Sequence, residues 1–547
     1  MLALIVNGQS LDLTADVSIT LKYSSPIFNT IGDFTYPFKI PVTPKNAIIL
    51  GFKHRVENSN DPYQEFDASL EMDGIFLLQG SLRILKADPT LYEATLFMDK
   101  GDFYYRRKNL TLQDIDFGEL VFTGETLKMD YINDCKNKAY PQRPVAFPMI
   151  LNKTYFEELP PEPVLEYFNY YVSSLIYYFT PSAEPYDRSV IVPMLYLRYV
   201  LEKIFEFIDF KFDDSFFSRD RDYNSLAIFN LVDCNTTATG FFFYDKLKLL
   251  LNYHVPRMNL NDFFIELERF FNLRFFVNNT SRTVRLKSVD HIVKSAEYIE
   301  FSNKIISTTV EPETKITGYS LKMDMDSGDE FEAAGKAAQD VVLGHILSPV
   351  QSISDLTPWP SSQVYDTRFV IDENDYYVLN PDQTWAVSPA IYWTWNMYSQ
   401  WIYKNKDQSI ETKFSTMIDD GITPYNCVVG NSREAWKEVS PKLFFVHYQD
   451  NGYGDETVHA RCFTPTNNLF YGGQFGLLNK HYKAYLDFRM SSKSVKIIKQ
   501  MTLMDLKTLD FSLKYMVNGV KYLLSDVQVS ISNSGIKPAT IKAYPIP

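Results

Sequence analysis

The chain has 547 residues, of which 45% are hydrophobic and 22% are charged, so disorder, collagen and coiled coil are excluded for the chain as a whole. At about 150 residues per domain, this length predicts three or four domains. The aromatic content of 15% favours extended β-structure and large buried contact surfaces. The net charge of −13, without a basic block, argues against a protein that grips nucleic acid, although an acidic wall could line a passage for DNA.

Cysteine spacing and hydropathy indicate the cellular compartment in which the chain is made. Four cysteines lie far apart and form no CxxC motif, which indicates free thiols rather than a zinc ribbon, a redox motif or a disulfide framework; they are Cys135, Cys234, Cys427 and Cys462. The N-terminal apolar run ends at Asn7 without a basic start, which predicts a first strand and turn and not a signal peptide. No run of about 18 apolar residues occurs, so we expect no membrane span, and assembly in a cytoplasm.

Residues 1 to about 125 are expected to form a small β-sandwich or barrel. Apolar residues alternate from Leu11 to Leu21. Further strands are predicted at a spacing of about ten residues, at Phe66–Leu70, Ile75–Leu78, Leu82–Leu85 and Tyr92–Phe97. Turns between them are predicted at Asp73-Gly74, Gly80 and Asp88-Pro89. The prolines of TYPFKIPVTPKN exclude a central strand there and favour an extended arm or an edge strand.

A repeat lies in the next region, residues 126–310, which is expected to be α+β. The segments VPMLYLRYVLEKIFEFIDFKF from Val192 and VPRMNLNDFFIELERFFNLRF from Val255 align over their whole length without a gap. Apolar residues recur in both at the spacing of one helix face, and a short strand follows each helix. Two unrelated amphipathic helices are the alternative. The predicted core of the repeat consists of Leu201, Ile204, Ile208, Phe264, Leu267 and Phe271.

Residues 311–461 are expected to form a mixed, Trp-rich region in which an insertion lies. Trp393, Trp395 and Trp401 could stack on sugar rings, but a buried strand or a protein interface explains them as well. His447 and His459 flank an acidic loop, which is interpreted as a polar hairpin loop rather than a metal site. The stretch DMDSGDE lacks the full spacing of a calcium loop. Without an HExxH, P-loop or GxSxG motif, we assign no catalytic residue, metal or cofactor and expect no enzyme.

Residues 462–547 are expected to form a second β module. Five strands are predicted, and the turn Asn518-Gly519 joins two of them. The segments are YKAYLDFRM, SVKIIKQMTL, DFSLKYMVNG, VKYLLSDVQVSIS and ATIKAYPI. The predicted fold class is therefore a multidomain, β-rich α+β protein, with small β-barrel or sandwich modules at both chain ends, a central helix–strand repeat and a mixed Trp-rich insertion.

Several segments resemble those of phage tail hub proteins, the baseplate hub and tail-tip hub family, of the type found in phages and prophages of the Bacteroides group. They occur in the same order and cover most of the chain outside residues 320–440. These segments are DVSITLKYSSPIFNTIGDFTYPFKIPVTPKN, the hairpins around DGIFLLQGSLRI, the helix–strand stretch VPRMNLNDFFIELERFFNLRFFVNNTSRTVRLKS, and the end of the chain from SPKLFFVHY to SDVQVSI.

The resemblance implies a structural protein of the virion tail, assembled in the host cytoplasm. In such hubs three subunits form a ring at the baseplate or tail tip, and two β domains per subunit supply six similar lobes that meet the sixfold tail tube. The ring is then a symmetry adaptor, which closes the channel and permits viral genome ejection. Implied partners are the homotrimer itself, the tail tube or distal tail protein, a tip or spike protein and the tape measure protein, while DNA passes without specific binding.

Two other classes stay open. One is a glycan-binding or glycan-cleaving tail protein that uses the Trp-rich region, and the other is a hexameric distal tail ring protein. For a hub, we expect residues 1–125 and 462–547 to fold into similar β modules, at one height around the axis and about 60° apart. The alternative is that the two ends pair with each other in one ordinary sandwich.

Overall fold

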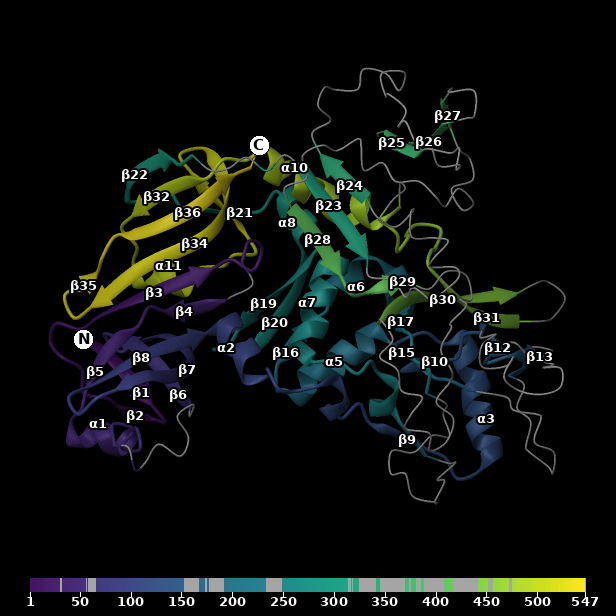
Figure 1. The fold of residues 1–547 in the computed structure, drawn as a ribbon, viewed down its shortest axis with the longest axis horizontal. Helices are drawn as coiled ribbons and strands as arrows, with labels where there is room; N and C mark the ends of the chain where they lie inside the picture. The colour runs from purple at the N-terminus through teal and green to yellow at the C-terminus, as the bar shows by residue number, and fades with distance from the viewer. Residues whose placement is uncertain are drawn as a thin grey trace, which may run out of the picture.

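The computed structural model is β-rich with shorter helices, which confirms the predicted fold class (Figure 1). Within the part of the chain that is described, no helix is long and apolar enough to cross a membrane. The described residues are all those of 1–547 except 30–31, 56, 58–64, 152–166, 173–174, 177–190, 233–247, 313–315, 317, 324–340, 345–368, 373–374, 380–384, 388–407, 417–440, 451–455, 472–474 and 547.

The first residues form a β-rich unit that we call the N-terminal lobe. Alternate side chains of its strands are buried in one core, as the period of a half-buried strand requires. A tight turn at Asp73-Gly74, both with positive φ, joins its two longest hairpin strands. The elements are β1 (Leu2–Val6), β2 (Gln9–Ser10), β3 (Ser18–Ser24), β4 (Asp33–Thr35), β5 (Phe38–Pro41), α1 (Pro44–Ile49), β6 (Glu65–Met72), β7 (Ile75–Ala87) and β8 (Leu91–Met98).

Two details of the predicted N-terminal module were wrong. Gly80 is not a turn, because it lies inside β7, which unites two predicted strands. A Cβ atom at Gly80 would stand 1.8 Å from the carbonyl oxygen of Phe97, so glycine allows β7 and β8 to approach closely there. In addition, the alternating residues before Ser18 are not a strand, although Leu11 and Val17 are buried as expected.

The second unit, the C-terminal lobe, is assembled from two distant parts of the chain. Its first strands are β21 (Tyr298–Glu300) and β22 (Ile305–Val310), which the sequence placed in the middle region. The hairpin turn at Asn518-Gly519 is confirmed, with positive φ at both residues. The remaining elements are β32 (Val495–Lys499), α11 (Leu503–Lys507), β33 (Lys514–Val517), β34 (Val520–Ser532), β35 (Gly535–Ile536) and β36 (Ala539–Pro545).

The two lobes share one strand order. Neighbours run β1-β6-β7-β8-β4-β3 in the N-terminal lobe, with β5 also on β8, and β21-β33-β34-β36-β32-β22 in the C-terminal lobe. The corresponding elements also follow each other in the same chain order, with α1 matching α11 before a hairpin whose second strand has 13 residues in both lobes. The exception is the first pair, which is antiparallel for β1 with β6 and parallel for β21 with β33. The two lobes thus have the same strand order, as expected of two similar modules, although the C-terminal lobe also takes β21 and β22 from outside residues 462–547.

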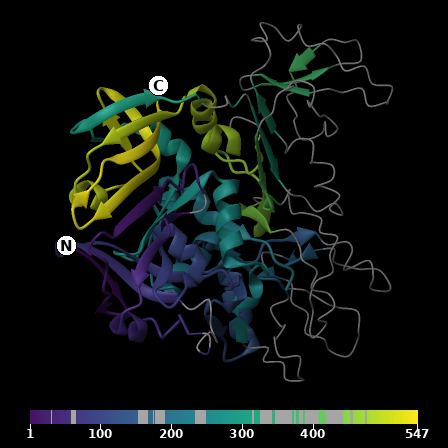
Figure 2. The same cartoon turned by 60° about the vertical axis from the view of Figure 1, so that its left-hand side comes forward.

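The lobes are joined edge to edge by β3 and β34. These strands pair antiparallel along the whole of β3, from Ser18 with Ser532 to Ser24 with Asp526, and make one continuous 15-stranded sheet of the described strands. The two chain ends therefore do pair with each other, yet each lobe keeps its own strand order. Both views place the lobes side by side on one flank of the molecule, with the helices of the middle region beside them (Figures 1 and 2).

A central module packs against both lobes around a core rich in phenylalanine. It includes residues 469–471 and 477–491, which were expected in the C-terminal β module, and the segment YKAYLDFRM is helical there instead of a strand. Its elements are α2 (Asp99–Arg106), β9 (Glu119–Val121), α3 (Glu125–Asp134), α5 (Leu197–Phe207), β16 (Lys211–Asp213), α6 (Ser215–Arg219), β18 (Lys248–Leu250), α7 (Leu260–Phe270), β19 (Leu273–Asn278), β20 (Thr283–Ser288), α8 (Val289–Lys294) and α10 (Lys483–Ser491).

The other described strands form smaller sheets on the far side of the central module from the lobes (Figure 1). The largest of these sheets has six strands, β10 (Val145–Ala146), β15 (Met194–Tyr196), β17 (Leu226–Ile228), β29 (Ser415–Thr416), β30 (Lys442–Asp450) and β31 (Glu456–Arg461). The rest are β11 (Ile150–Leu151), β12 (Tyr167–Phe168), β13 (Tyr171–Val172), β14 (Leu175–Ile176), β23 (Gly318–Met323), β24 (Val341–Gly344), β25 (Phe369–Asp372), β26 (Asp375–Leu379), β27 (Trp385–Val387) and β28 (Gln408–Thr412).

Candidate functional site

The helix–strand repeat found in the sequence is also present in the structure. Helices α5 and α7 have 11 residues each and begin at Leu197 and Leu260, which are matched positions of the two aligned segments. Each is followed by a residue in the left-handed region, Asp209 with φ 58° and Asn272 with φ 48°, and then by a strand. Strand β16 of the first copy pairs parallel with β20, and β19 of the second pairs antiparallel with the same strand.

The six residues predicted as the core of the repeat lie in one hydrophobic cluster. Ile208 is only partly buried, and the others, Leu201, Ile204, Phe264, Leu267 and Phe271, are buried. The rings of Phe205 and Phe264 stack at 5.5 Å between the two helices. The repeat is therefore a packed support beside the lobes.

The polar candidates from the sequence do not form a site within the described residues. Trp393, Trp395 and Trp401 lie outside them, as do Cys234, Cys427 and the stretch DMDSGDE. His447 and His459 face each other as partners in the β30–β31 hairpin. Among the described side chains no group of three metal-binding residues occurs, and Cys135 and Cys462 are buried cysteines outside any disulfide bond.

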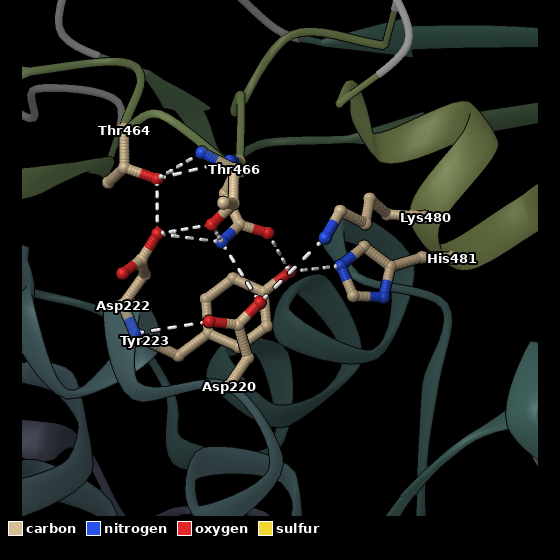
Figure 3. A network of polar contacts seen from close by, with 8 residues as sticks. Asp220, Asp222, Tyr223, Thr464, Thr466, Lys480 and His481 are labelled. Carbon is tan, nitrogen blue, oxygen red and sulfur yellow. Dashed lines mark hydrogen bonds and ion pairs between the residues drawn. The ribbon is translucent and has the colours of Figure 1, made fainter.

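A largely buried polar network that the sequence did not reveal lies where Thr464, Thr466 and His481 approach Asp222 and Tyr223 (Figure 3). The hydroxyl of Tyr223 donates to Oδ1 of Asn467 at 3.0 Å and lies 2.7 Å from Nε2 of His481. The carboxylate of Asp222 accepts hydrogen bonds from the hydroxyls of Thr464 and Thr466 and from the Asn467 amide. Asp222 and Tyr223 are close to the other members of the network only in space, so no local sequence pattern predicts the network.

The electrostatics of this network suit a structural clamp and not acid–base chemistry. Burial lowers the pKa of His481 to about 3, with Lys480 adding to the effect, so its imidazole is neutral at pH 7. Burial also raises the pKa of Tyr223. Desolvation opposes the charge of Asp222, but hydrogen bonds from Thr464 and its neighbours outweigh it and lower the pKa. His481, Tyr223 and Asp222 therefore each keep one protonation state near pH 7.

A second buried cluster ties the N-terminal lobe to the repeat. Nζ of Lys100, at the start of α2, donates to both oxygens of Glu268 in α7, at 2.9 and 3.3 Å, and the two side chains are each 4% exposed. The same Glu268 accepts the backbone N–H of Phe275 at 2.9 Å. Burial lowers the pKa of Lys100, while the Glu268 charge opposes that shift. The pair holds α2, which directly follows β8, against the second copy of the repeat.

Carboxylates crowd beside this ion pair. Asp99 and Asp102 accept hydrogen bonds, both 2.9 Å long, from the backbone and the side chain of Asn279 in the β19–β20 loop. Burial, together with the nearby charge of Asp102, raises the pKa of Asp99 to about 6. Asp33 in β4 accepts the N–H of Ser24, and burial followed by the charge of Asp99 raises its pKa. At the junction of lobe and support, burial and neighbouring carboxylates therefore disfavour the charged forms of Asp33 and Asp99, whereas Asp102 is paired with Arg106 at 2.8 Å.

Comparison with known proteins yields distant structural neighbours alone. No family model and no curated protein matches the chain. The 43 kDa tail protein of prophage MuSo2 from Shewanella oneidensis is similar with a TM-score of 0.31 and 7% identity, over 99% of this chain and 97% of that chain. The tail protein from Neisseria meningitidis MC58 gives a TM-score of 0.30 and 8% identity, over 100% and 95%. Similarity at this level does not establish a shared fold or function.

Proposed function

We propose that the chain is a structural phage tail protein, a homotrimeric hub that adapts the sixfold tail tube to a threefold tip. The observation that carries the proposal is the repeated strand order of the two lobes. A ring of three chains that meets a ring of six needs two equivalent lobes per chain, since otherwise alternate tube subunits would have no partner. In a hub of this kind the lobes alternate around the axis, close the channel and later allow DNA to pass.

The rest of the described structure is compatible with this role. The polar network and the ion pair join distant segments of the chain, as expected of a structural part that bears mechanical load. The formal charge of the proposed trimer is 3 × −13 = −39 at pH 7, and a wall of that sign does not retain DNA. The proposed partners are the tail tube or distal tail protein, a tip or spike protein and the tape measure protein.

The mass of the native assembly tests the proposal. Native mass spectrometry of the purified protein should give three times the mass of one chain, which is 63.5 kDa. An assembly of six times that mass would overturn the trimeric hub in favour of a distal tail ring protein. A single chain at micromolar concentration would also contradict the proposal.

The proposal includes no catalytic step. The pure protein is expected to leave peptidoglycan and capsule polysaccharide intact. Hydrolysis of either polymer, lost when one carboxylate is changed to an amide, would replace the hub with the glycan-cleaving alternative.

A further inference from the structure

Strand β22 leaves one of its edges open. It is the last strand of the large sheet and pairs with β32 on one side, and no strand among the described residues pairs with its other side. Its sequence, IISTTV, contains no charge and no proline. The side chains of Ile306 and Val310 are 59% and 62% exposed.

Such an edge is unusual in a protein that works alone. Edge strands are ordinarily protected by an inward-pointing charge, a proline, a bulge or a covering loop, since their free N–H and C=O groups recruit other strands. Here Lys304 and the pair Glu311-Pro312 stand at the two ends of the strand, and a bulge at Ile306 interrupts the pairing with β32. The four residues Ser307–Val310 carry no charge, proline or bulge of their own. The composition of β22 therefore suits a strand that receives a partner.

The internal repeat identifies that partner. Strand β22 of the C-terminal lobe corresponds to β3 of the N-terminal lobe, and the outer edge of β3 pairs with β34. The strand that corresponds to β34 is β7. Within one chain β7 and β22 are separated by the six strands β8, β4, β3, β34, β36 and β32, which is roughly 34 Å along the sheet at the usual strand spacing of about 4.8 Å. The partner of β22 is then β7 of a second copy.

The far end of β7 has one edge that no described strand pairs with. Pairing between β6 and β7 stops at Glu65 with Arg83, so within the described residues Ile84–Ala87 pairs only with β8. Leu85, at a bulge in that pairing, is 49% exposed. On β34, pairing with β33 stops at Tyr522, and β3 occupies the same edge from Asp526 onward. The open part of β7 thus lies where β34 receives β3.

We propose that β22 of one copy pairs with Ile84–Ala87 of a second copy and repeats between chains the β3–β34 seam found within each chain. The proposal rests on the hub proposed above, because three such seams and three internal ones close a ring of six lobes. It predicts the contact that holds the trimer, which the symmetry argument alone does not specify.

A photo-crosslinking residue in place of Val310 tests the contact. Val121 in β9 of the central module is a matched control, because it is a valine in a strand with the same 62% exposure. After irradiation, the Val310 variant should give covalent species with two and three times the mass of one chain, and the cross-linked peptide should contain Ile84–Ala87. The Val121 variant should stay at the mass of one chain.

The possible outcomes separate this inference from the proposed function. A native trimer without a cross-link to β7, or with one to another element, would overturn the seam and leave the hub intact. A hexamer with the cross-link would keep the strand pairing and overturn the hub. As a second variant, Thr308→Lys should lower the native mass to one chain while the circular dichroism spectrum is retained; a lysine variant that still forms full trimers would contradict the seam.

Discussion

The buried ion pair between the N-terminal lobe and the repeat offers a sharp test of how these parts are joined. Glu268→Gln keeps the size of the side chain and an oxygen for the N–H of Phe275, but it removes the charge opposite Lys100. Both partners are almost fully buried, so the substitution leaves an ammonium group without a counter-charge. Breaking such a pair costs about 3–5 kcal/mol, whereas an exposed pair contributes about 1 kcal/mol or less.

Hydrogen exchange is the appropriate assay, because a multidomain chain has no single free energy of unfolding. Amide exchange in α2 and α7 should accelerate about a hundred-fold to a few thousand-fold in Glu268→Gln, as about 1.4 kcal/mol corresponds to a factor of ten. The double variant Lys100→Met with Glu268→Gln should recover most of the loss, since no charge is then buried. An acceleration of less than about five-fold, or a double variant as unstable as the single one, would refute the reasoning.

The pH dependence has a definite sign. Burial lowers the pKa of Lys100 in the folded protein, and removing the Glu268 charge should lower it further. Below the folded pKa the lysine is charged in both states and the full penalty applies. Above the unfolded pKa of about 10.4 it is neutral in both, and the penalty vanishes. The defect of Glu268→Gln should therefore shrink as the pH rises from 7 toward 10.

Three further predictions concern stability. Asp99→Asn should stabilise its surroundings at pH 7 by at most about 3 kcal/mol, because the pKa of Asp99 is about 6 in the folded protein against an ordinary value of 3.8. Above pH 6 the native carboxylate is charged and therefore destabilising. The gain in stability, measured by hydrogen exchange, should fade as the pH drops toward 4. Leu267→Asp should unfold the repeat, seen as lost circular dichroism and rapid proteolysis, whereas Ile208→Asp, at a partly buried position, should cost much less; equal losses would contradict the burial pattern. Gly80→Ala should lower the melting temperature because of the 1.8 Å approach to a β8 carbonyl, whereas Gly124→Ala, with open space, should not.

The sequence predicted what depends on local periodicity. The helix–strand repeat was found from a pattern of apolar residues every three or four positions, and the structure begins both helices at matched positions of the alignment. The turns at Asp73-Gly74 and Asn518-Gly519 were found because type I′ turns need residues that accept positive φ. Features of this kind depend on about twenty consecutive residues of the chain.

Other features could not be predicted from segments of that length. The segment around Tyr485 alternates like a strand but forms a helix, because its buried side chains pack into the central core. The C-terminal lobe was incomplete in the prediction, since Ile305–Val310 joins Val495–Lys499 across a long intervening segment. The polar network around Tyr223 and His481 was not predicted for the same reason, because these two residues are 258 positions apart in the sequence.

The pairing of β3 with β34 also sets the order in which parts of the chain can fold during synthesis. Strand β3 is complete soon after translation begins, but its partner β34 follows near the other end of the chain, and β32 to β36 all come after the 311–494 segment. At about 5–20 residues per second, the β3 edge waits on the order of 25–100 s for its partner. A chain that stops before β34 therefore leaves the edge of β3 without its partner. In the proposed hub such a copy would also lack one of its two lobes and could not close the ring.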